Sequence, residues 1–403
     1  MLMSKEPMDK STTGRRNFVK AAASTSALGA VAISGVATAA NRYKDTRGPM
    51  PTRVLGATGE QVPILHLGTS QRLDQRYDKV MHRSFQAGVT WFDTALSYGW
   101  GSSHTAIANF IGQMGDRKKL FLTSKSGSGS VGGLKSGLNE ALEELQTDYV
   151  DLFLMHGIDD EDMLEPEFLR AGADMKKSGK TRFFGFSCHD GNVAGLMEKA
   201  ARVGGIDAIL FRYSFRRYGD LELNRAIDAC HKAGIGLMAM KTMGSVPAEL
   251  EAVAEFESKQ FTLGQAKLKS VLGDERIASI CSEMDSVQRV RENVAAAKME
   301  QPLTAGEAHQ LNRLAALTSG YACNGCKQHC ERAAGGLAIS DQLRFLMYHD
   351  CYAGKATRAR QLFAQLHAEQ RTYDEQRLAA AAAVCPQGID LVSRIRDAHA
   401  ALA

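Results

Sequence analysis

Four side chains that can exchange protons follow short apolar stretches in the first half of this 403-residue chain. They are one carboxylate, one phenol, one ammonium and one imidazole, in the order Asp93, Tyr98, Lys125 and His156. Each ends or closely follows a run of the kind that a buried parallel strand produces. Because the same ends of neighbouring parallel strands lie together, the sequence predicts one proton-transfer site built from all four.

The chemistry that suits this set is the interconversion of a carbonyl and an alcohol. Reduction needs a hydride on carbon and a proton on oxygen, and a phenol is a poor acid at neutral pH unless its anion is stabilised. Lys125 would stabilise the Tyr98 anion, and Asp93 would keep the ammonium charged and oriented. His156 can hydrogen-bond the substrate oxygen and fix its position.

The elements that must position these groups are eight apolar runs that alternate with segments of helical periodicity. The runs are residues 64–69, 91–95, 120–125, 150–156, 182–187, 208–213, 236–241 and 279–284. Eight such units over roughly 250 residues fit a (β/α)8 TIM barrel, in which the chemistry lies at the carboxyl ends of several strands. A doubly wound open sheet is the competing arrangement, and the polar strand ends favour the barrel. A short hairpin over residues 53–64 is expected to close its bottom.

The segments around the four residues resemble the aldo-keto reductase family over about residues 53–295. The pieces that carry the likeness are Phe92-Asp93-Thr94-Ala95 with Tyr98-Gly99, Thr123-Ser124-Lys125, and the run from Leu142 to His156. The resemblance implies an oxidoreductase that uses NADP(H), or NAD(H), and takes Tyr98 as its general acid and base.

The resemblance also implies a set of cofactor-binding residues. Ser187 would approach the nicotinamide carboxamide, and the ring of Tyr213 would stack on the nicotinamide. The remaining positions are Lys241 and Thr242 near the pyrophosphate or ribose, Ser282 in the adenosine-binding loop, Arg289 toward the 2′-phosphate, and Glu292 and Asn293 toward adenine.

Three positions depart from the family pattern. Cys188 stands where an Asn is common, Leu210 where a Gln contacts the nicotinamide amide, and Glu283 where a Lys often neutralises the 2′-phosphate. These changes leave the choice between NADP and NAD open. They also keep a second function in view, an electron-transfer or partner-binding protein on a catalytically weakened barrel.

Beyond about residue 300 the strand-like runs stop, and helices are expected over residues 307–317, 340–347, 356–369, 373–383 and 390–401. This helical region contains Cys323-x2-Cys326-x3-Cys330, three thiols close enough for one metal centre. Cys385 follows in a Cys-Pro-x-Gly-Ile-Asp sequence that resembles the closing ligand of ferredoxin-like clusters. The four cysteines are therefore expected to bind a [4Fe–4S] cluster, as in a subset of aldo-keto reductase relatives.

Other uses of these thiols stay open. Zinc could take the three clustered cysteines with Cys385, His329 or His349. Disulfides could form in an oxidising compartment, with Cys351 included, and Cys351 could also replace Cys385 as the fourth ligand.

The N-terminal segment looks like an export signal. Arg15 and Arg16 precede a mildly apolar run that ends in small residues, which resembles a twin-arginine signal over residues 1–39 and predicts a periplasmic protein. An amphipathic first helix or a membrane anchor is the alternative. We expect a linker over residues 40–52, the barrel over 53–299 and the helical cluster domain over 300–403.

The charge balance restricts the partners. The formal net charge is +4, and most of that surplus lies in residues 1–39. The near-neutral remainder gives no reason to expect nucleic-acid binding. We expect a small carbonyl or alcohol substrate and no stable membrane insertion, with a redox partner protein as a further candidate.

Overall fold

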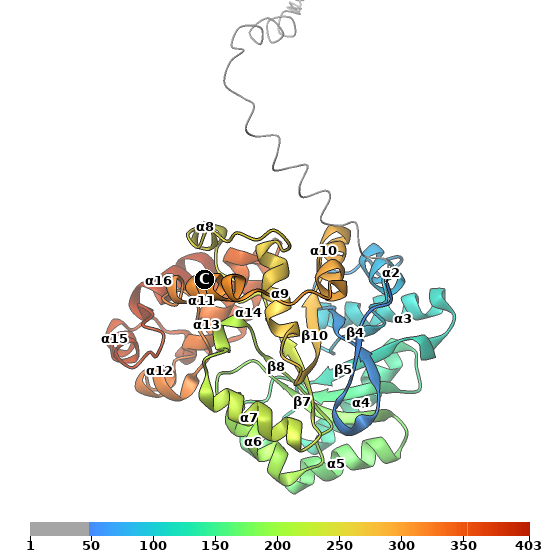
Figure 1. Ribbon diagram of the computed structural model, residues 1–403. Coiled ribbons are helices and arrows are strands. Elements are labelled where there is room, and N and C mark those ends of the chain that lie inside the picture. The colour runs from blue at the N-terminus through green and yellow to red at the C-terminus, as the bar shows by residue number, and fades with distance from the viewer. Residues whose placement is uncertain (1–47, 353) are drawn as a thin grey trace, which may run out of the picture. The chain divides into compact units, whose positions relative to one another are not determined.

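A computed structural model describes residues 48–352 and 354–403 of the chain. Eight parallel strands close into a barrel, with helices packed around it (Figure 1). The strands, in the order in which they pair around the barrel, are β10 (Ile277–Glu283), β3 (Leu65–Gly68), β4 (Trp91–Asp93), β5 (Phe121–Ser126), β6 (Val150–Met155), β7 (Thr181–Cys188), β8 (Ala208–Arg212) and β9 (Gly236–Met240). The predicted (β/α)8 barrel is confirmed, and the open sheet is excluded.

The helices alternate with the strands as the sequence predicts. Those of the barrel are α2 (Lys79–Gln86), α3 (Ser102–Met114), α4 (Val131–Leu145), α5 (Pro166–Lys177), α6 (Val193–Val203), α7 (Leu221–Lys232), α8 (Ala248–Ala252), α9 (Leu263–Leu272) and α10 (Val287–Lys298). Single 3-10 turns lie at η1 (Gly56–Thr58), η2 (Tyr98–Gly101), η3 (Arg117–Lys119), η4 (Glu161–Leu164) and η5 (Phe215–Arg217).

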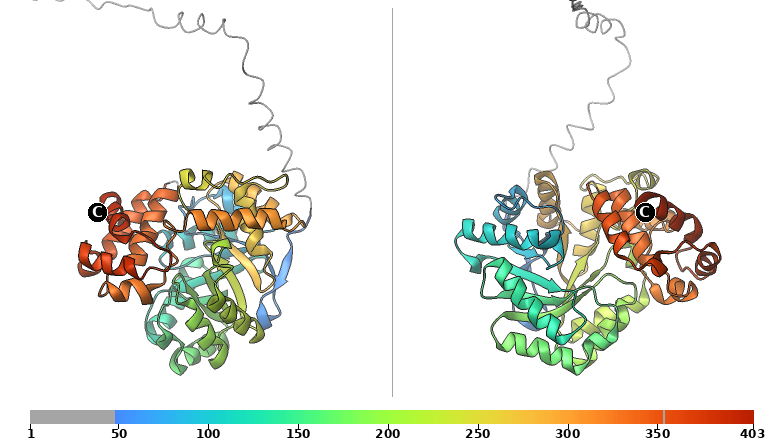
Figure 2. Two further views of the ribbon diagram at one scale, coloured as in Figure 1. Left: turned by 60° about the vertical axis from the view of Figure 1, so that its left-hand side comes forward. Right: turned by 180° about the vertical axis from the view of Figure 1, so that it is seen from behind.

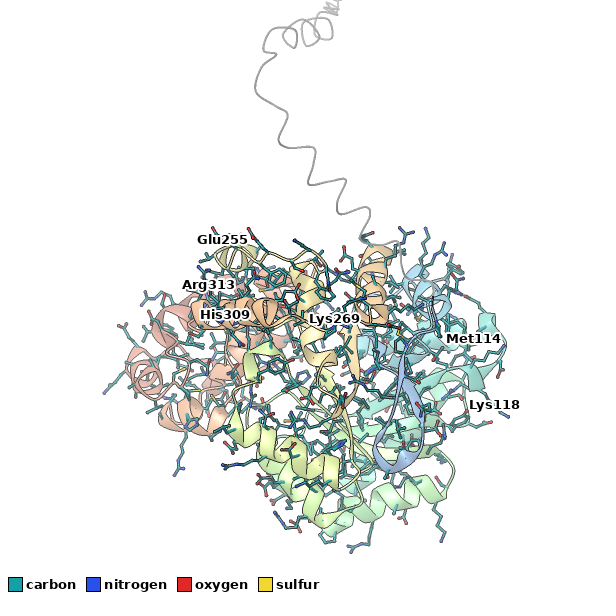
Figure 3. All side chains as sticks on the ribbon, viewed as in Figure 1. Met114, Lys118, Glu255, Lys269, His309 and Arg313 are labelled. Atoms are coloured by element: carbon teal, nitrogen blue, oxygen red, sulfur yellow. The ribbon has the colours of Figure 1, made fainter. Side chains whose placement is uncertain are left out.

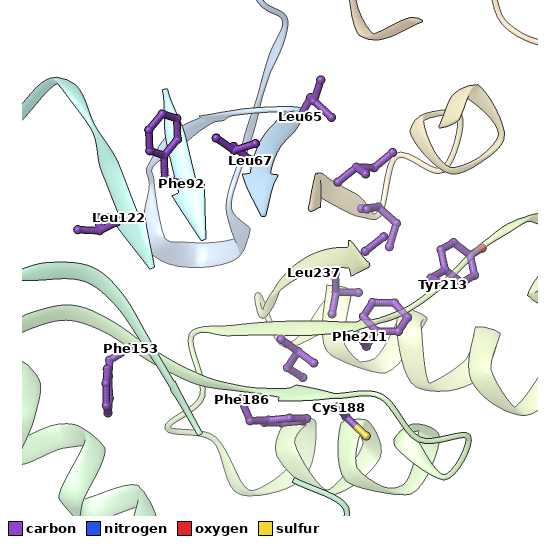
Figure 4. Packing of buried hydrophobic residues seen from close by; sticks show 14 of the residues in the cluster. Leu65, Leu67, Phe92, Leu122, Phe153, Phe186, Cys188, Phe211, Tyr213 and Leu237 are labelled. Carbon is purple, nitrogen blue, oxygen red and sulfur yellow. The ribbon is translucent and has the colours of Figure 1, made fainter. Parts of the chain in front are cut away.

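The buried side chains form two layers because successive residues of a strand point to opposite faces. In β6, Leu152 and Leu154 belong to the cluster that fills the barrel interior. Phe153 and Met155 belong to the larger cluster between the strands and the helices, part of which is drawn in Figure 4. This alternation decides which residue at a strand end can reach the space above the barrel.

The expected hairpin is present at the amino-terminal ends of the strands. Strands β1 (Thr52–Val54) and β2 (Gln61–Pro63) pair antiparallel. The Arg53 guanidinium donates to the backbone carbonyls of Leu272 and Ile277, which fixes the hairpin to the start of β10. The strand ends that carry the polar residues thus lie at the opposite end of the barrel.

The C-terminal region is helical and packs against the barrel within one compact unit, residues 45–403. Figures 1 and 2 show its last helices, coloured orange to red, gathered on one side of the barrel. Its elements are α11 (Ala305–Leu317), α12 (Lys327–Ala333), α13 (Ile339–Cys351), α14 (Ala356–Gln365), η6 (Ala368–Arg371), α15 (Glu375–Ala383) and α16 (Leu391–Leu402). The five expected helices are present, and α12, which carries Cys330, was not expected.

The predicted export signal, residues 1–39, lies outside the described residues. Residues 40–47 of the expected linker lie outside them too. Within the described part of the chain, every helix is too short or too polar to span a membrane.

Gly56 offers a test of how tightly the hairpin seals the barrel. It has a φ of +53°, and an added Cβ would lie 2.3 Å from the Gly234 carbonyl oxygen. We expect Gly56→Ala to lower the free energy of unfolding by about 3 kcal/mol, because a steric overlap adds to the backbone strain. Gly59 has a φ of +76° with open space around it, so Gly59→Ala should cost only about 1 kcal/mol. Denaturant unfolding measures both, and equal losses would contradict the packing argument.

Candidate active site

The centre of the site is an ion pair buried inside the barrel mouth. Asp93 ends β4, and Lys125 lies near the end of β5 with its side chain directed inward. The Lys125 ammonium lies 2.5 Å from the Asp93 Oδ1 and also donates to the Thr94 carbonyl at 2.7 Å. Both charged side chains are almost fully buried. Burial raises the pKa of Asp93, and the attraction of Lys125 opposes that rise.

Tyr98 lies above this pair, at the start of η2. Its hydroxyl is 3.5 Å from the Lys125 Nζ, which also lies 4.8 Å from the centre of the ring. Burial and the Asp93 carboxylate raise the pKa of Tyr98 well above its usual value. The sequence predicted that Lys125 would ease ionisation of the phenol. In the structure the ammonium is closer to Asp93, so Tyr98 is a protonated hydroxyl that can donate a hydrogen bond or a proton.

His156 follows β6 and faces Tyr98 edge-on, with the ring centres 5.6 Å apart. Burial, Lys125 and Arg344 together lower the pKa of His156 to about 3. The imidazole is therefore neutral at ordinary pH and can act as a hydrogen-bonding group beside Tyr98 without adding a charge. The structure thus brings together all four residues that the sequence singled out.

The space above Tyr98 and His156 is a cavity of about 420 Å³. The barrel supplies its floor, and α13 of the C-terminal region supplies part of its wall through Arg344, Phe345 and Tyr348. A volume of this size suits a small organic molecule. The sequence did not indicate the contribution of α13, because nothing in a helical periodicity tells which distant surface the helix covers.

His189 was also missed as a site residue. It follows β7, lines the same cavity and has its Nδ1 buried without a hydrogen-bond partner. Burial and Arg344 lower its pKa well below the usual value, so this second imidazole is neutral too. The signal that could have found it is its position directly after a strand, the same rule that identified His156.

Ser187 and Lys241, two of the expected cofactor residues, lie near the cavity. Ser187 is buried at the end of β7, and its Oγ accepts a hydrogen bond from the Gly157 amide at 2.9 Å. Lys241 follows β9 and lines the cavity, with its Nζ 4.5 Å above the ring of Tyr348. Thr242, the next residue, is buried.

Tyr213 lies elsewhere. Its ring is buried in the layer between strands and helices, as Figure 4 shows, and its hydroxyl donates to the Asp274 carboxylate at 2.9 Å. The reason is strand alternation in β8, which directs Phe211 and Tyr213 toward the helices. Arg212 takes the other side, where its guanidinium donates to the Cys323 carbonyl. The structure therefore does not bring Tyr213 to the cavity.

The expected adenosine-binding residues lie at the end of β10 and along α10. Asn293 donates to the Ser282 hydroxyl at 2.9 Å, and both are buried. Arg289 and Glu292 form a partly exposed ion pair at 3.2 Å. The four residues thus form two contacting pairs, one between β10 and α10 and one along α10, and their role in binding adenosine stays a prediction.

The three departures from the family pattern have different surroundings. Cys188 is directed toward the surrounding helices, and Leu210 is packed inside the barrel. Glu283 lines the cavity, where the Lys355 ammonium of the C-terminal region lies 2.6 Å from its carboxylate. The negative charge that the sequence introduces at Glu283 is thus balanced by a lysine about seventy residues later.

The four cysteines expected to bind metal come together in the C-terminal region. Cys323 and Cys326 precede α12, Cys330 lies on it, and Cys385 lies between α15 and α16. Burial raises the pKa of Cys330 to about 12, and the thiols of Cys323, Cys326 and Cys385 add to the rise. All eight cysteines of the chain are described, and none forms a disulfide.

Cys351 is separate from this group. Its sulfur lies 3.9 Å from the Tyr321 hydroxyl, at the end of α13. Burial, together with nearby Asp350 and Glu251, raises the pKa of Cys351 to about 11, whereas the Tyr321 hydrogen bond lowers it. The structure therefore groups Cys385, and not Cys351, with the three closely spaced cysteines.

The cysteine loop packs directly on the barrel beside the cavity. The Gly191 amide donates to the Gly325 carbonyl at 2.8 Å, two residues after His189. An added Cβ at Gly191 would lie 2.7 Å from the Cys326 nitrogen, so the loop and the barrel touch with no space for a side chain. The group of four cysteines and the cavity thus share the segment that follows β7.

Known proteins resemble the barrel of this chain. Residues 65–246 match the model of the Aldo/keto reductase family. L-galactose dehydrogenase of Arabidopsis thaliana is 27% identical over 281 residues, which cover 60% of this chain and 87% of that protein.

Solved structures show the same fold. An aldo-keto reductase from Bacillus halodurans superposes with a TM-score of 0.56 at 23% identity, over 66% of this chain and 96% of that one. An aldo/keto reductase from Klebsiella pneumoniae, in complex with NADP and acetate, gives a TM-score of 0.53 at 23% identity, over 66% and 95%. Residues 65–246, which include the buried Asp93–Lys125 pair, are therefore similar to the aldo/keto reductase family, the solved structures share the barrel fold, and together these likenesses support an oxidoreductase.

Proposed function

We propose that this protein interconverts a small carbonyl compound and its alcohol by hydride transfer, with Tyr98 as the general acid in reduction and the general base in oxidation. The observation that carries the proposal is the position of the Tyr98 side chain, whose hydroxyl lies 3.5 Å from the Lys125 ammonium of the buried ion pair and whose ring faces His156 in the cavity. A bound nicotinamide would supply the hydride or accept it.

The residues of this chain then act on the substrate oxygen. In reduction, His156 hydrogen-bonds the carbonyl oxygen and Tyr98 passes its proton to that oxygen as negative charge develops there. The charge left on Tyr98 is stabilised by Lys125, whose ammonium Asp93 holds in place. The intact set of four argues against the non-enzymatic alternative of a weakened barrel.

NADP fits the residues around the cavity in part. Ser187 lies near the floor, and Arg289 lies at the start of α10 with its side chain half exposed. Tyr213 takes no part in this proposal, because its ring faces the helices. We infer that Lys355 compensates the Glu283 carboxylate, so that a 2′-phosphate is not repelled at that place. The NADP in the Klebsiella pneumoniae relative agrees with this choice.

We propose further that the four grouped cysteines bind a [4Fe–4S] cluster. Thiolates on one tetrahedral zinc lie about 3.8 Å apart. In the described part of the chain, the three candidate ligand atoms within 4.8 Å of one another belong to His66, Asp93 and Cys281 instead. Four grouped thiols with a Cys-Pro-x-Gly-Ile-Asp sequence at Cys385 support a cube, and the Gly325 amide already donates to the Cys323 sulfur at 3.3 Å. When bound, the cluster would exchange single electrons.

Export by the twin-arginine route remains part of the proposal. It rests on Arg15, Arg16 and the small-residue run within residues 1–39, which lie outside the described part of the chain. Since that route carries folded proteins, a cluster and a nucleotide could be bound before export. A redox partner protein in the periplasm would then suit the cluster.

Tyr98→Phe should remove the proton donor and leave the cavity intact. We expect the rate of 4-nitrobenzaldehyde reduction by NADPH to fall about 10²–10⁴-fold while the affinity for NADPH stays within twofold. Tyr149, at the opposite end of the barrel, gives the matched control, because Tyr149→Phe also removes one hydroxyl. Turnover that survives Tyr98→Phe would show that another group supplies the proton.

Lys355→Met should expose the uncompensated charge of Glu283 to the nucleotide. We expect the dissociation constant of NADPH to rise about tenfold, which is about 1.4 kcal/mol, and that of NADH to rise less. Adding Glu283→Gln to Lys355→Met should restore NADPH binding, because the carboxylate charge is then gone. Fluorescence titration measures each dissociation constant. Equal losses of affinity for NADPH and NADH would show that Lys355 and Glu283 do not lie near the 2′-phosphate.

Cys385→Ser and Cys351→Ser test which of the two thiols is the fourth cluster ligand. Anaerobically purified wild-type protein should contain about four iron atoms per chain, and Cys385→Ser should lose most of that iron and its visible absorbance. Cys351→Ser should keep both, because that thiol lies beside Tyr321. Metal analysis that finds zinc in place of iron, or iron loss only in Cys351→Ser, would contradict the assignment.

A further inference from the structure

The cavity above Tyr98 is closed by a wall that the aldo/keto reductase barrel itself does not provide. Helix α13 contributes Arg344 and Tyr348, and Tyr352 follows directly after it. A molecule that occupies this cavity beside Tyr98 and His156 therefore touches the C-terminal region. The chemistry of this wall is the best indication of what the cavity takes.

The cavity is lined by more basic than acidic side chains, five against four. Each of the four carboxylates lies close to a basic partner from the same lining. The pairs are Lys327 with Asp159 at 3.0 Å and with Asp190 at 3.1 Å, Lys355 with Glu283 at 2.6 Å, and Arg344 with Asp341. Three basic side chains thus partner the four carboxylates, and the basic total of five is reached only with Lys241 and Arg358.

Lys241 stands apart from these pairs. Its Nζ lies 4.5 Å from the ring centre of Tyr348 and 5.7 Å from that of Tyr352. Among the described residues, no carboxylate forms an ion pair with it. The ammonium therefore faces two aromatic rings and hydrogen-bonds the Tyr348 side chain, and Glu283 attracts it without forming an ion pair.

Arg344 brings a second cation to the same phenol. Burial raises the pKa of Tyr348, yet Lys241 and Arg344 outweigh burial and bring it below its usual value. Burial lowers the pKa of His156 and that of His189, and Arg344 lowers both further, so both imidazoles are neutral. Two cations, one phenol and two uncharged imidazoles thus surround the space next to Tyr98.

We propose that this cavity takes a small hydroxy or oxo compound that carries an anionic group, a carboxylate or a phosphate, bound between Lys241 and Arg344 beside the Tyr348 hydroxyl. Paired basic side chains and a hydroxyl donor are the groups that recognise such anions. The other end of the molecule lies at Tyr98 and His156, a placement that rests on the proposed function. The volume of about 420 Å³ holds a compound of this size.

The same cations could meet the pyrophosphate of a nucleotide instead. The two sources differ in a way that can be measured. An anionic substrate binds together with NADPH, whereas a pyrophosphate site is filled by NADPH and then excludes other anions.

The test compares matched charged and neutral compounds on the holoprotein without nucleotide. D-gluconate is compared with D-glucose, and glycerol 3-phosphate with glycerol, by thermal shift and calorimetric titration. At least one anion should raise the melting temperature and bind at least tenfold more tightly than its neutral counterpart. Lys241→Met should reduce that affinity at least tenfold, as should Arg344→Met combined with Asp341→Asn, which leaves no unpaired carboxylate behind.

Controls remove equal charges elsewhere. Lys118 lies at the other end of the barrel and Arg313 on α11, both exposed on the surface and labelled in Figure 3. Lys118→Met and Arg313→Met should leave the affinity unchanged. Tyr98→Phe should also retain anion binding while it loses carbonyl reduction, so a failure of the proposed reaction is distinguishable from a failure of this site.

Three results would overturn the proposal. The first is that neither anion binds more tightly than its neutral counterpart. The second is that the variants of Lys241 and Arg344 keep the preference for the anion. The third is that saturating NADPH displaces the anion. The last result would assign the two cations to the nucleotide.

Discussion

The arrangement of the site depends on one buried ion pair, between the Lys125 ammonium and the Asp93 carboxylate. Two charges so deep inside a barrel are costly to desolvate. The pair is stable because the Lys125 ammonium and the Asp93 carboxylate are only 2.5 Å apart and because the ammonium also donates a hydrogen bond to the Thr94 carbonyl. Removing one partner would leave the other charged and alone in the barrel mouth. The pair therefore fixes the ends of β4 and β5 relative to each other and sets the electrostatic surroundings of Tyr98.

The C-terminal region completes the site and is more than an appendage. It closes the cavity with α13, and it balances Glu283 with Lys355. Its cysteine loop packs on the segment after β7 at Gly191, two residues from His189. Any change in how the four cysteines are held would therefore act on a wall of the cavity. This contact gives a physical route by which the state of a cluster could influence binding at Tyr98.

Much of this architecture could be predicted from the sequence because it depends on local patterns. Apolar runs with polar ends gave the eight strands and brought Asp93, Lys125 and His156 to one end of the barrel. Tyr213 was placed wrongly because the alternation of side chains along β8 was not counted. That alternation puts Arg212, and not Tyr213, on the side of the cavity. The roles of Arg344 and other residues of α13 could not be predicted, because contacts across more than a hundred residues leave no periodicity in the chain.

The central claim is that Lys125, held by Asp93, acts through Tyr98 in the proton transfer. A double-mutant cycle on the single-turnover rate of aldehyde reduction, with NADPH bound in excess, measures this coupling directly. If the claim is right, Lys125→Met slows the reaction about as much as Tyr98→Phe, and the double variant is little slower than either single variant. Losses that multiply in the double variant would show that the two side chains act independently, and would contradict the account.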